Sequence, residues 1–179
     1  LKTKQGETFN CKAIIICSGV YLKSKIIIGK YSKDVGPNGF ANASDLSDSL
    51  TKLGFKLRRF KTGTPVRIDG KDYSCLEVQK GEDNIQTFST ITVEKPRNVA
   101  DCYLTYTNPT THKLILDNLN LAPMYNGDIK GTGPRYCPSI ESKVVRFADK
   151  ERHQLFLEPE GLDTNEVYLQ GFSTSMPVD

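Results

Sequence analysis

The chain has 179 residues, of which 37% are hydrophobic, so it is long enough for one packed domain or slightly more. It carries 24 Lys and Arg residues against 21 Asp and Glu, and the resulting net charge of +3 does not by itself predict nucleic-acid binding. No apolar run approaches the roughly 20 residues of a membrane span. The five cysteines and two histidines lack the spacing of a metal site, which argues against zinc, and unpaired thiols favour a cytoplasmic location.

The first 60 residues have the pattern of an incomplete α/β domain. A β-branched run at 13–17 is typical of a strand buried on both faces of a parallel sheet, and a second short strand is predicted at 25–28. Leucines spaced i, i+4, i+7 predict a helix over 44–53. Ligands tend to bind where such strands end and such helices begin, although an ordinary buried strand or turn is the simpler explanation of each feature.

Residues 60–100 have an irregular, β-rich pattern, and regular strand and helix patterns follow them. Gly, Pro and short β-like runs dominate residues 60–100, and the run at 86–93 is the most strand-like among them. Further on, the patterns predict a strand at 102–107, helices at 112–119 and 139–149, and strands at 154–157 and 166–169.

A basic run lies between Lys52 and Arg67, where six basic residues occur without an acidic one. It is either a solvated face or a site for phosphates. Within it, cations and hydroxyl groups around a flexible glycine suit contacts to phosphate or ribose, and a polar turn is the equal alternative. The candidate contacts are Lys61, Thr62, Thr64 and Arg67.

Cys137 is the candidate reactive residue. It directly precedes a predicted helix, with Pro138 well placed as the first helical residue. The positive end of a helix dipole and the nearby Arg135 both favour the thiolate form, which suits a nucleophile or an acid. A buried structural cysteine is the alternative, since that is the common fate of a free thiol.

Four motifs carry a resemblance to a known family. The stretches Lys61–Pro65, Gly133–Glu141, Leu157–Gly161 and Ser173–Pro177 resemble the GidA/MnmG family in order and spacing, across essentially the whole chain. Several long matches in one order are far more specific than any one of them. Because the chain begins at Leu1 and stops at Asp179 without terminal signals, we interpret it as an internal piece of a longer member.

The resemblance implies an activity, cofactors and partners. Members of this family modify carbon 5 of the wobble uridine of certain tRNAs, adding a carboxymethylaminomethyl or aminomethyl group. They use FAD, NADH and a folate-derived one-carbon donor, and they act as cytoplasmic or mitochondrial homodimers with an MnmE-type GTPase partner subunit. The implied fold is α/β, part of a glutathione-reductase-like FAD-binding fold with an inserted mixed, β-rich domain. Residues 1–60 would belong to the FAD-binding domain, 61–170 to an inserted NADH-associated domain, and 171–179 to the FAD-binding domain again.

The resemblance also implies roles for individual residues. Ser18, Gly19 and Ala43 match FAD contacts, although the family pattern has Thr in place of Ser18. Cys137 matches a functional cysteine that can add to carbon 6 of the uracil ring, and Arg135 would hold a phosphate or a uracil oxygen. The stretch assigned to NAD comprises Gly133, Pro134, Arg135, Tyr136, Cys137, Pro138, Ser139, Ile140, Glu141, Ser142, Lys143, Val144, Val145, Arg146 and Phe147.

Parts of the family pattern are missing from these residues. The glycine-rich FAD fingerprint, a second functional cysteine and the C-terminal helical region do not occur, so weak FAD binding at best and an inactive isolated chain are expected. The related folate- and FAD-dependent tRNA uracil methyltransferase is the alternative enzyme. A non-catalytic module that binds nucleotide or tRNA is the alternative from another class, and a structural segment without a ligand is the third.

Overall fold

The structure is a computed structural model that describes residues 1–70, 72–83, 85–133 and 136–178. It divides into two compact units, Leu1–Ile27 with Tyr31–Leu57, and Ile28–Lys30 with Arg58–Asp179. Helices and strands occur together, in agreement with an α/β class, while the predicted domain boundaries at 60 and 170 stay predictions. The elements are β1 (Ile26–Ile28), β2 (Tyr31–Lys33), η1 (Pro37–Gly39), α1 (Ser44–Lys52), β3 (Pro65–Asp69), β4 (Glu77–Gln79), β5 (Cys102–Tyr106), α2 (Pro109–Asp117), η2 (Leu119–Leu121), α3 (Ile140–Arg146), β6 (Gln154–Pro159) and β7 (Glu166–Ser173).

In the first unit, helix α1 confirms the prediction made from leucine spacing. Asp45 lies in its first turn and Lys52 in its last, an arrangement that complements the helix dipole. Gly54 follows with a φ of 89°, the left-handed conformation common at helix C-termini. The apolar stripe is shorter than predicted, because Leu53 at its end is exposed. The short strand predicted at 25–28 is also confirmed, as β1 pairs with β2.

The buried strand predicted at 13–17 is wrong for this chain. Residues 13–17 form no strand, and the side chain of Ile15 is 90% exposed. A buried parallel strand needs hydrogen-bonded neighbours on its edges. Within the described residues, no segment pairs with 13–17, so this apolar run has no sheet to bury it. Cys11 and Cys17, which flank the run, are exposed as well.

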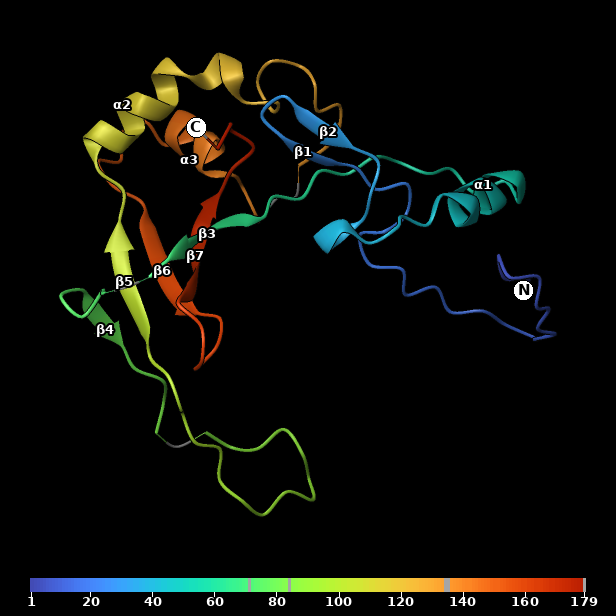
Figure 1. Ribbon diagram of the computed structural model, residues 1–179, viewed down its shortest axis with the longest axis horizontal. Helices are drawn as coiled ribbons and strands as arrows, with labels where there is room; N and C mark the ends of the chain where they lie inside the picture. The colour runs from blue at the N-terminus through green and yellow to red at the C-terminus, as the bar shows by residue number, and fades with distance from the viewer. Residues whose placement is uncertain (71, 84, 134–135, 179) are drawn as a thin grey trace. The chain divides into compact units, whose positions relative to one another are not determined.

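The second unit is built on a five-stranded antiparallel sheet of order β3-β7-β6-β5-β4, drawn in Figure 1. Leu157 of β6 pairs with Tyr103 on one side and Leu169 on the other. Leu155 and Leu157 alternate with less buried neighbours, as expected for a sheet with one covered face. The strands predicted at 102–107, 154–157 and 166–169 are confirmed, and the structure extends the last two.

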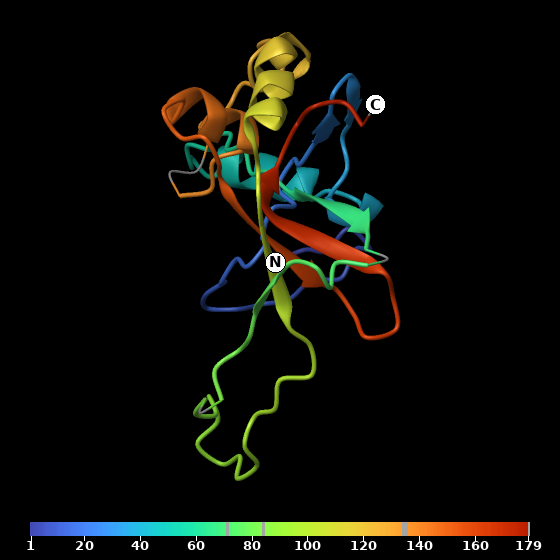
Figure 2. The same cartoon turned by 90° about the vertical axis from the view of Figure 1, so that its left-hand side faces the viewer.

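The strand-like run at 86–93 is a wrong prediction. It forms no strand in the structure and lies in the long excursion between β4 and β5, seen in Figures 1 and 2 as an extended loop. Its aromatic residue Phe88 is fully exposed. Strand propensity becomes a strand only where a partner edge and an apolar face are available, and the described part of the excursion has neither.

Helices α2 and α3 lie at one end of this sheet (Figure 2) and pack against each other. Ile115 from α2 meets Ile140 and Val144 from α3 in the core, with Leu119 and Phe172 partly buried beside them. Burial of this kind stabilises the fold by about 1.5–3 kcal/mol for each large apolar side chain.

The start of α2 lies three residues before the predicted position. The Asn108 side chain caps it by accepting a 2.9 Å hydrogen bond from the Thr111 N–H, and Pro109 occupies the first turn. This cap signal is readable in the sequence. Helix α3 is shorter than predicted, since it begins after the N-cap Ser139 and gives way to a non-helical Phe147.

No helix in the described ranges of the chain has the length and apolar character needed to cross a membrane.

Candidate functional site

The Lys61 segment lies beside the loop that leads to Cys137. Phe60 forms a parallel bridge with Thr132. The Lys61 N–H donates a 3.1 Å hydrogen bond to the Thr132 carbonyl oxygen. Two motifs that are distant in the sequence therefore meet at the edge where β3 begins.

Gly63 brings the same segment against the end of β7. A Cβ atom at this position would lie 2.5 Å from the Ser173 Oγ and 3.6 Å from the Lys61 Nζ. The first distance is too short for any side chain, so only glycine permits this approach. The ammonium group of Lys61 and the hydroxyl group of Ser173 thus lie close to one common point.

Glu141, in the first turn of α3, lies fully buried at this junction. Its Oε1 accepts hydrogen bonds from the Thr174 hydroxyl group at 2.7 Å and from the Ser175 N–H at 3.0 Å. Its Oε2 has no hydrogen-bond partner among the described residues, and neither have the buried hydroxyl groups of Ser173 and Ser175. A buried carboxylate is costly unless a cation or donors satisfy it. The junction therefore has spare capacity for a positive charge or a polar ligand.

Two partly buried lysines interact electrostatically with Cys137. Burial lowers the pKa of Lys61, and the negative charges of Glu141 and Cys137 offset part of that effect. Burial also lowers the pKa of Lys143, again partly offset by Cys137. The Lys143 ammonium group is fixed by a 2.8 Å hydrogen bond to the Gly171 carbonyl oxygen. Cys137 itself is exposed, so its sulfur is accessible while both cations lie within electrostatic range.

The electropositive environment predicted for Cys137 has a different origin in the structure. Helix α3 begins at Ile140, not at Pro138, and the Ser139 side chain already accepts the Ser142 N–H at its start. The N-terminus of α3 is therefore farther from the Cys137 thiol, and one of its free N–H groups already has an acceptor. Arg135, the predicted second source of charge, and Pro134 lie outside the described residues. Lys61 and Lys143 supply the nearby charge, and the sequence analysis paired neither with Cys137.

The stretch predicted to bind NAD divides into exposed and buried parts. Gly133, Tyr136 and Cys137 are exposed, as are the residues at the end of α3. In contrast, the side chains at the start of α3 point into the core and contact other protein groups. These buried residues are Ser139, Ile140, Glu141, Ser142 and Val144. Among these residues, only the exposed ones are open to a ligand, and the assignment of the whole stretch to NAD stays a prediction.

The predicted FAD contacts in the first unit converge on one residue. Tyr21 donates its N–H to the Ser18 carbonyl oxygen at 3.2 Å and accepts the Ala43 N–H at 2.8 Å. Gly19 has a φ of 52° in this turn, and the N-cap Ala43 makes no side-chain capping bond. The turn and the start of α1 are thus adjacent, with uncapped N–H groups that fit a phosphate-bearing or polar ligand.

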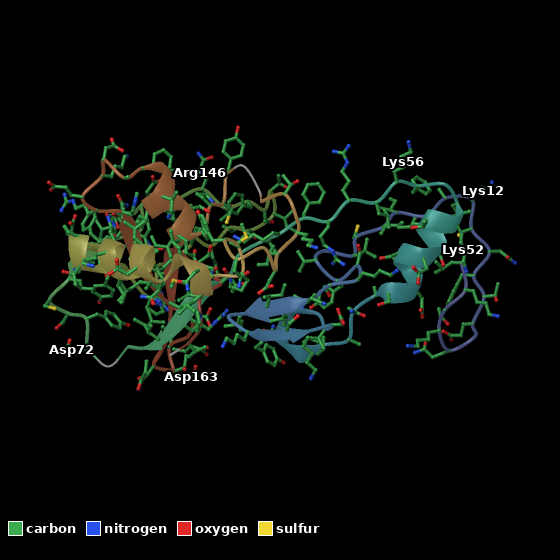
Figure 3. All side chains as sticks on the ribbon, turned by 90° about the horizontal axis from the view of Figure 1, so that it is seen from above. Lys12, Lys52, Lys56, Asp72, Arg146 and Asp163 are labelled. Atoms are coloured by element: carbon green, nitrogen blue, oxygen red, sulfur yellow. The ribbon has the colours of Figure 1, made fainter. Side chains whose placement is uncertain are left out.

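The predicted phosphate contacts have varied environments. Thr62 and Thr64 are exposed. Arg67 donates from Nε to the Glu160 carboxylate at 2.8 Å and lies 3.4 Å from Glu166. Figure 3 shows Lys52 and Lys56 at the surface of the first unit, whereas Lys61 and Arg67 belong to the second. Their role in phosphate binding stays a prediction.

Comparison with known proteins gives consistent matches. The family model described as "Glucose inhibited division protein A" matches residues 1–179. The chain is 53% identical over 179 residues to the "tRNA uridine 5-carboxymethylaminomethyl modification enzyme MnmG" of Clostridium kluyveri, covering 99% of this chain and 28% of the relative. It is 54% identical to the protein of the same name from Bacillus subtilis, with the same coverage of both chains.

Solved structures match as well. The chain superposes on Aquifex aeolicus GidA in its form I crystal with a TM-score of 0.85 and 46% identity, over 98% of this chain and 31% of that one. In the form II crystal the TM-score is 0.75, with 44% identity over 89% and 26% of the two chains. The chain belongs to the glucose inhibited division protein A family. It spans less than a third of the length of these relatives.

Proposed function

We propose that this chain is a segment of a tRNA-modifying enzyme that adds a carboxymethylaminomethyl or aminomethyl group to carbon 5 of the wobble uridine. The observation that carries the proposal is the exposed Cys137 thiol, within electrostatic range of Lys61 and Lys143, in a chain 53–54% identical to enzymes named for this modification. Those names favour this reaction over the methyl transfer considered above.

Cys137 is the proposed catalytic residue. A thiolate at this position adds to carbon 6 of the uracil ring and makes carbon 5 nucleophilic. Its exposure lets a base reach the sulfur, and Lys61 and Lys143 lie within electrostatic range of it. Arg135, close to Cys137 in sequence, is proposed to hold a phosphate or a uracil oxygen.

Cofactor binding is proposed for two places. Ser18, Gly19 and Ala43 would contact FAD through the turn that Tyr21 links to α1, as part of a glutathione-reductase-like fold. The loop at 133–137 would contact NADH. When bound, the reduced flavin supplies reducing equivalents, while the residues of this chain bind and orient it.

The partners belong to the proposal for the whole protein. They are tRNA, an MnmE-type GTPase subunit, a folate-derived one-carbon donor and a second copy in a homodimer, in the cytoplasm or in mitochondria. The exposed cations Lys52, Lys56 and Arg58 suit contacts to tRNA phosphates.

A chimera tests the proposal. This chain would replace the matching stretch of the Bacillus subtilis relative, to which it is 54% identical, in a strain that lacks that relative. Mass spectrometry of digested tRNA then measures the modified uridine. We expect modification by the chimera, its loss with Cys137→Ser, and its retention with Cys75→Ser at another exposed thiol. A folded, abundant chimera that leaves the uridine unmodified contradicts the proposed function, and full modification by Cys137→Ser contradicts the role of the thiol.

A further inference from the structure

The excursion between β4 and β5 is a closed arm that extends from the edge of the sheet. It leaves β4 after Gln79 and returns to β5 at Cys102, and Figures 1 and 2 show it as one extended loop. Its base is closed by Asn98, whose Nδ2 donates to the Glu82 carbonyl oxygen at 3.5 Å. Only glycine permits this closure, because a Cβ atom at position 81 would lie 2.3 Å from the same nitrogen. We call residues 81–98 the arm.

The outer part of the arm exposes apolar side chains and unpaired backbone groups. Residues 85–93 include no charged residue. Phe88 is fully exposed, and the exposed fractions of Ile91 and Val93 are 88% and 95%. Within the described part of the chain, no backbone–backbone hydrogen bond involves residues 85–93. An uncharged, β-branched run with a free backbone is open to pairing with another strand.

The run is complementary to itself in the antiparallel direction. When two copies are paired about Ser89, Ile85 of one copy lies opposite Val93 of the other, and Thr87 lies opposite Ile91. Because alternate residues of a strand share a face, both of these pairs lie on the same side of the ribbon. Each pair joins two β-branched residues, which is a favourable cross-strand combination.

The charges that flank the run fit the same register. Asp83 of one copy lies opposite Lys95 of the other, and the two-fold symmetry repeats this pair. Both side chains are exposed, and among the described residues no ion pair joins them within one chain. A slip by one residue sets Asp83 against Glu94 in one direction, and Ile85 against Glu94 in the other. Charge complementarity therefore selects the register centred on Ser89.

We propose that the arm is a dimerisation element, which pairs antiparallel about Ser89 with the arm of a second copy of this chain. The proposal rests on the homodimer named in the proposed function and gives it a surface, and it is independent of the tRNA chemistry. In the free arm, Thr87 Oγ1 donates to the Ser89 carbonyl oxygen at 2.9 Å, and the Ile91 N–H donates to Ser89 Oγ at 3.3 Å. Pairing exchanges these local bonds for a ladder between the copies. A two-stranded ribbon is marginal by itself, so we expect dimerisation to depend on concentration.

Cross-linking at the two-fold axis tests the register. Residues directly opposite each other in an antiparallel pair lie about 4.5–5.5 Å apart at Cα, which suits a disulfide. Under mild oxidation, we expect Ser89→Cys to give a covalent dimer that peptide mass spectrometry shows to be linked from position 89 to position 89. Ser32→Cys, at an exposed serine of β2, is the matched control and should give no dimer linked through position 32. The five native cysteines are the same in both variants.

Charge exchange tests the pairing of Asp83 with Lys95. Asp83→Lys sets two lysines against each other on both sides of the axis, so the dimer dissociation constant should rise about two- to thirtyfold, the range for two exposed ion pairs. Adding Lys95→Asp restores opposite charges and should restore the dissociation constant, which a purely structural role of either residue does not predict. Asp163→Lys makes the same charge change at an exposed residue outside the arm and should leave dimerisation unchanged. Sedimentation equilibrium over a concentration series measures all four proteins.

Each outcome decides the proposal. It is overturned if position 89 does not link to itself, either in this chain or in the chimera, where an arm that packs on the rest of the parent protein would also stay unlinked. It is overturned as well if the double exchange dimerises no better than Asp83→Lys. A dimer that persists with position 89 unlinked forms through another surface. If the arms link but the chimera leaves the uridine unmodified, the proposed tRNA chemistry fails and the dimerisation arm stands.

Discussion

The ammonium group of Lys143 donates a 2.8 Å hydrogen bond to the carbonyl oxygen of Gly171, which ties helix α3 to strand β7. Gly171 has a φ of 92°, a conformation that side-chain-bearing residues rarely adopt. The pairing of β7 with β3 is irregular over this stretch, between the pairs Arg67–Tyr168 and Pro65–Ser173. The Lys143–Gly171 contact fixes one of the two cations that interact electrostatically with Cys137.

Gly171→Ala should destabilise the chain by about 2–4 kcal/mol. About half of this is the cost of the left-handed conformation, and the remainder is overpacking, because a Cβ atom would lie 3.1 Å from the Gln154 carbonyl oxygen. Gly127→Ala is the matched control. Its φ is also 92°, but its Cβ would meet no described atom within 4 Å, so it should lose only about 1–2 kcal/mol. Urea unfolding measures both, and equal losses would show that contact with Gln154 is unimportant.

Glu141→Ala should cost more stability than Glu141→Gln, by at least about 1 kcal/mol. Alanine leaves the buried Ser175 N–H and the Thr174 hydroxyl group without their acceptor, at a cost of about 1–3 kcal/mol. Glutamine keeps a carbonyl oxygen at the same place. Urea midpoints of the two variants give the comparison. Similar losses for both would mean that the carboxylate charge matters more than these two hydrogen bonds.

The ion pair of Arg67 with Glu160 should contribute little to stability. The Nε–Oε2 distance is 2.8 Å, but both side chains remain partly exposed. A double-mutant cycle with Arg67→Ala and Glu160→Ala should give a coupling free energy of about 0.2–1 kcal/mol. It should decrease further in 0.5 M salt, where screening is stronger. A salt-independent coupling well above this range would contradict the weak, surface character of the pair.

The sequence predicts those features that depend on neighbouring residues. Apolar spacing places Ile115, Ile140 and Val144 on helices that the structure contains, and the Asn108 cap could have corrected the start of α2. The run at 13–17 has the composition of a buried strand, but its burial depends on a sheet that the described residues do not supply. Local pattern cannot reveal whether such a partner is present.

The same limit applies to the candidate site. The exposed Cys137 and the basic Lys61 segment are visible as motifs, but their proximity arises from the bridge between Phe60 and Thr132. The contact of Glu141 with Thr174 and Ser175 arises where α3 meets the end of β7. These are tertiary contacts between distant segments, and no spacing along the chain encodes them.

His153 should make the chain less stable at acidic pH. Its side chain is buried, its Nε2 has no partner within the described residues, and the His112 ring lies 5.2 Å away. Burial lowers the pKa of His153, and the positive charges of His112, Lys143 and Lys150 lower it further. Below about pH 6.5, the ordinary value for histidine, the unfolded chain therefore binds this proton more readily than the folded chain.

The contribution of His153 to the free energy of unfolding should thus be constant above about pH 7 and decrease as the pH falls below 6.5. The slope for a single proton is at most about 1.4 kcal/mol per pH unit. Urea unfolding of the wild type and His153→Gln from pH 8 to pH 5 measures it. Glutamine does not titrate, so the difference between the two proteins should change with pH in this window, with the wild type losing more stability toward pH 5. Parallel curves would show that His153 is protonated equally well in the folded and unfolded chains.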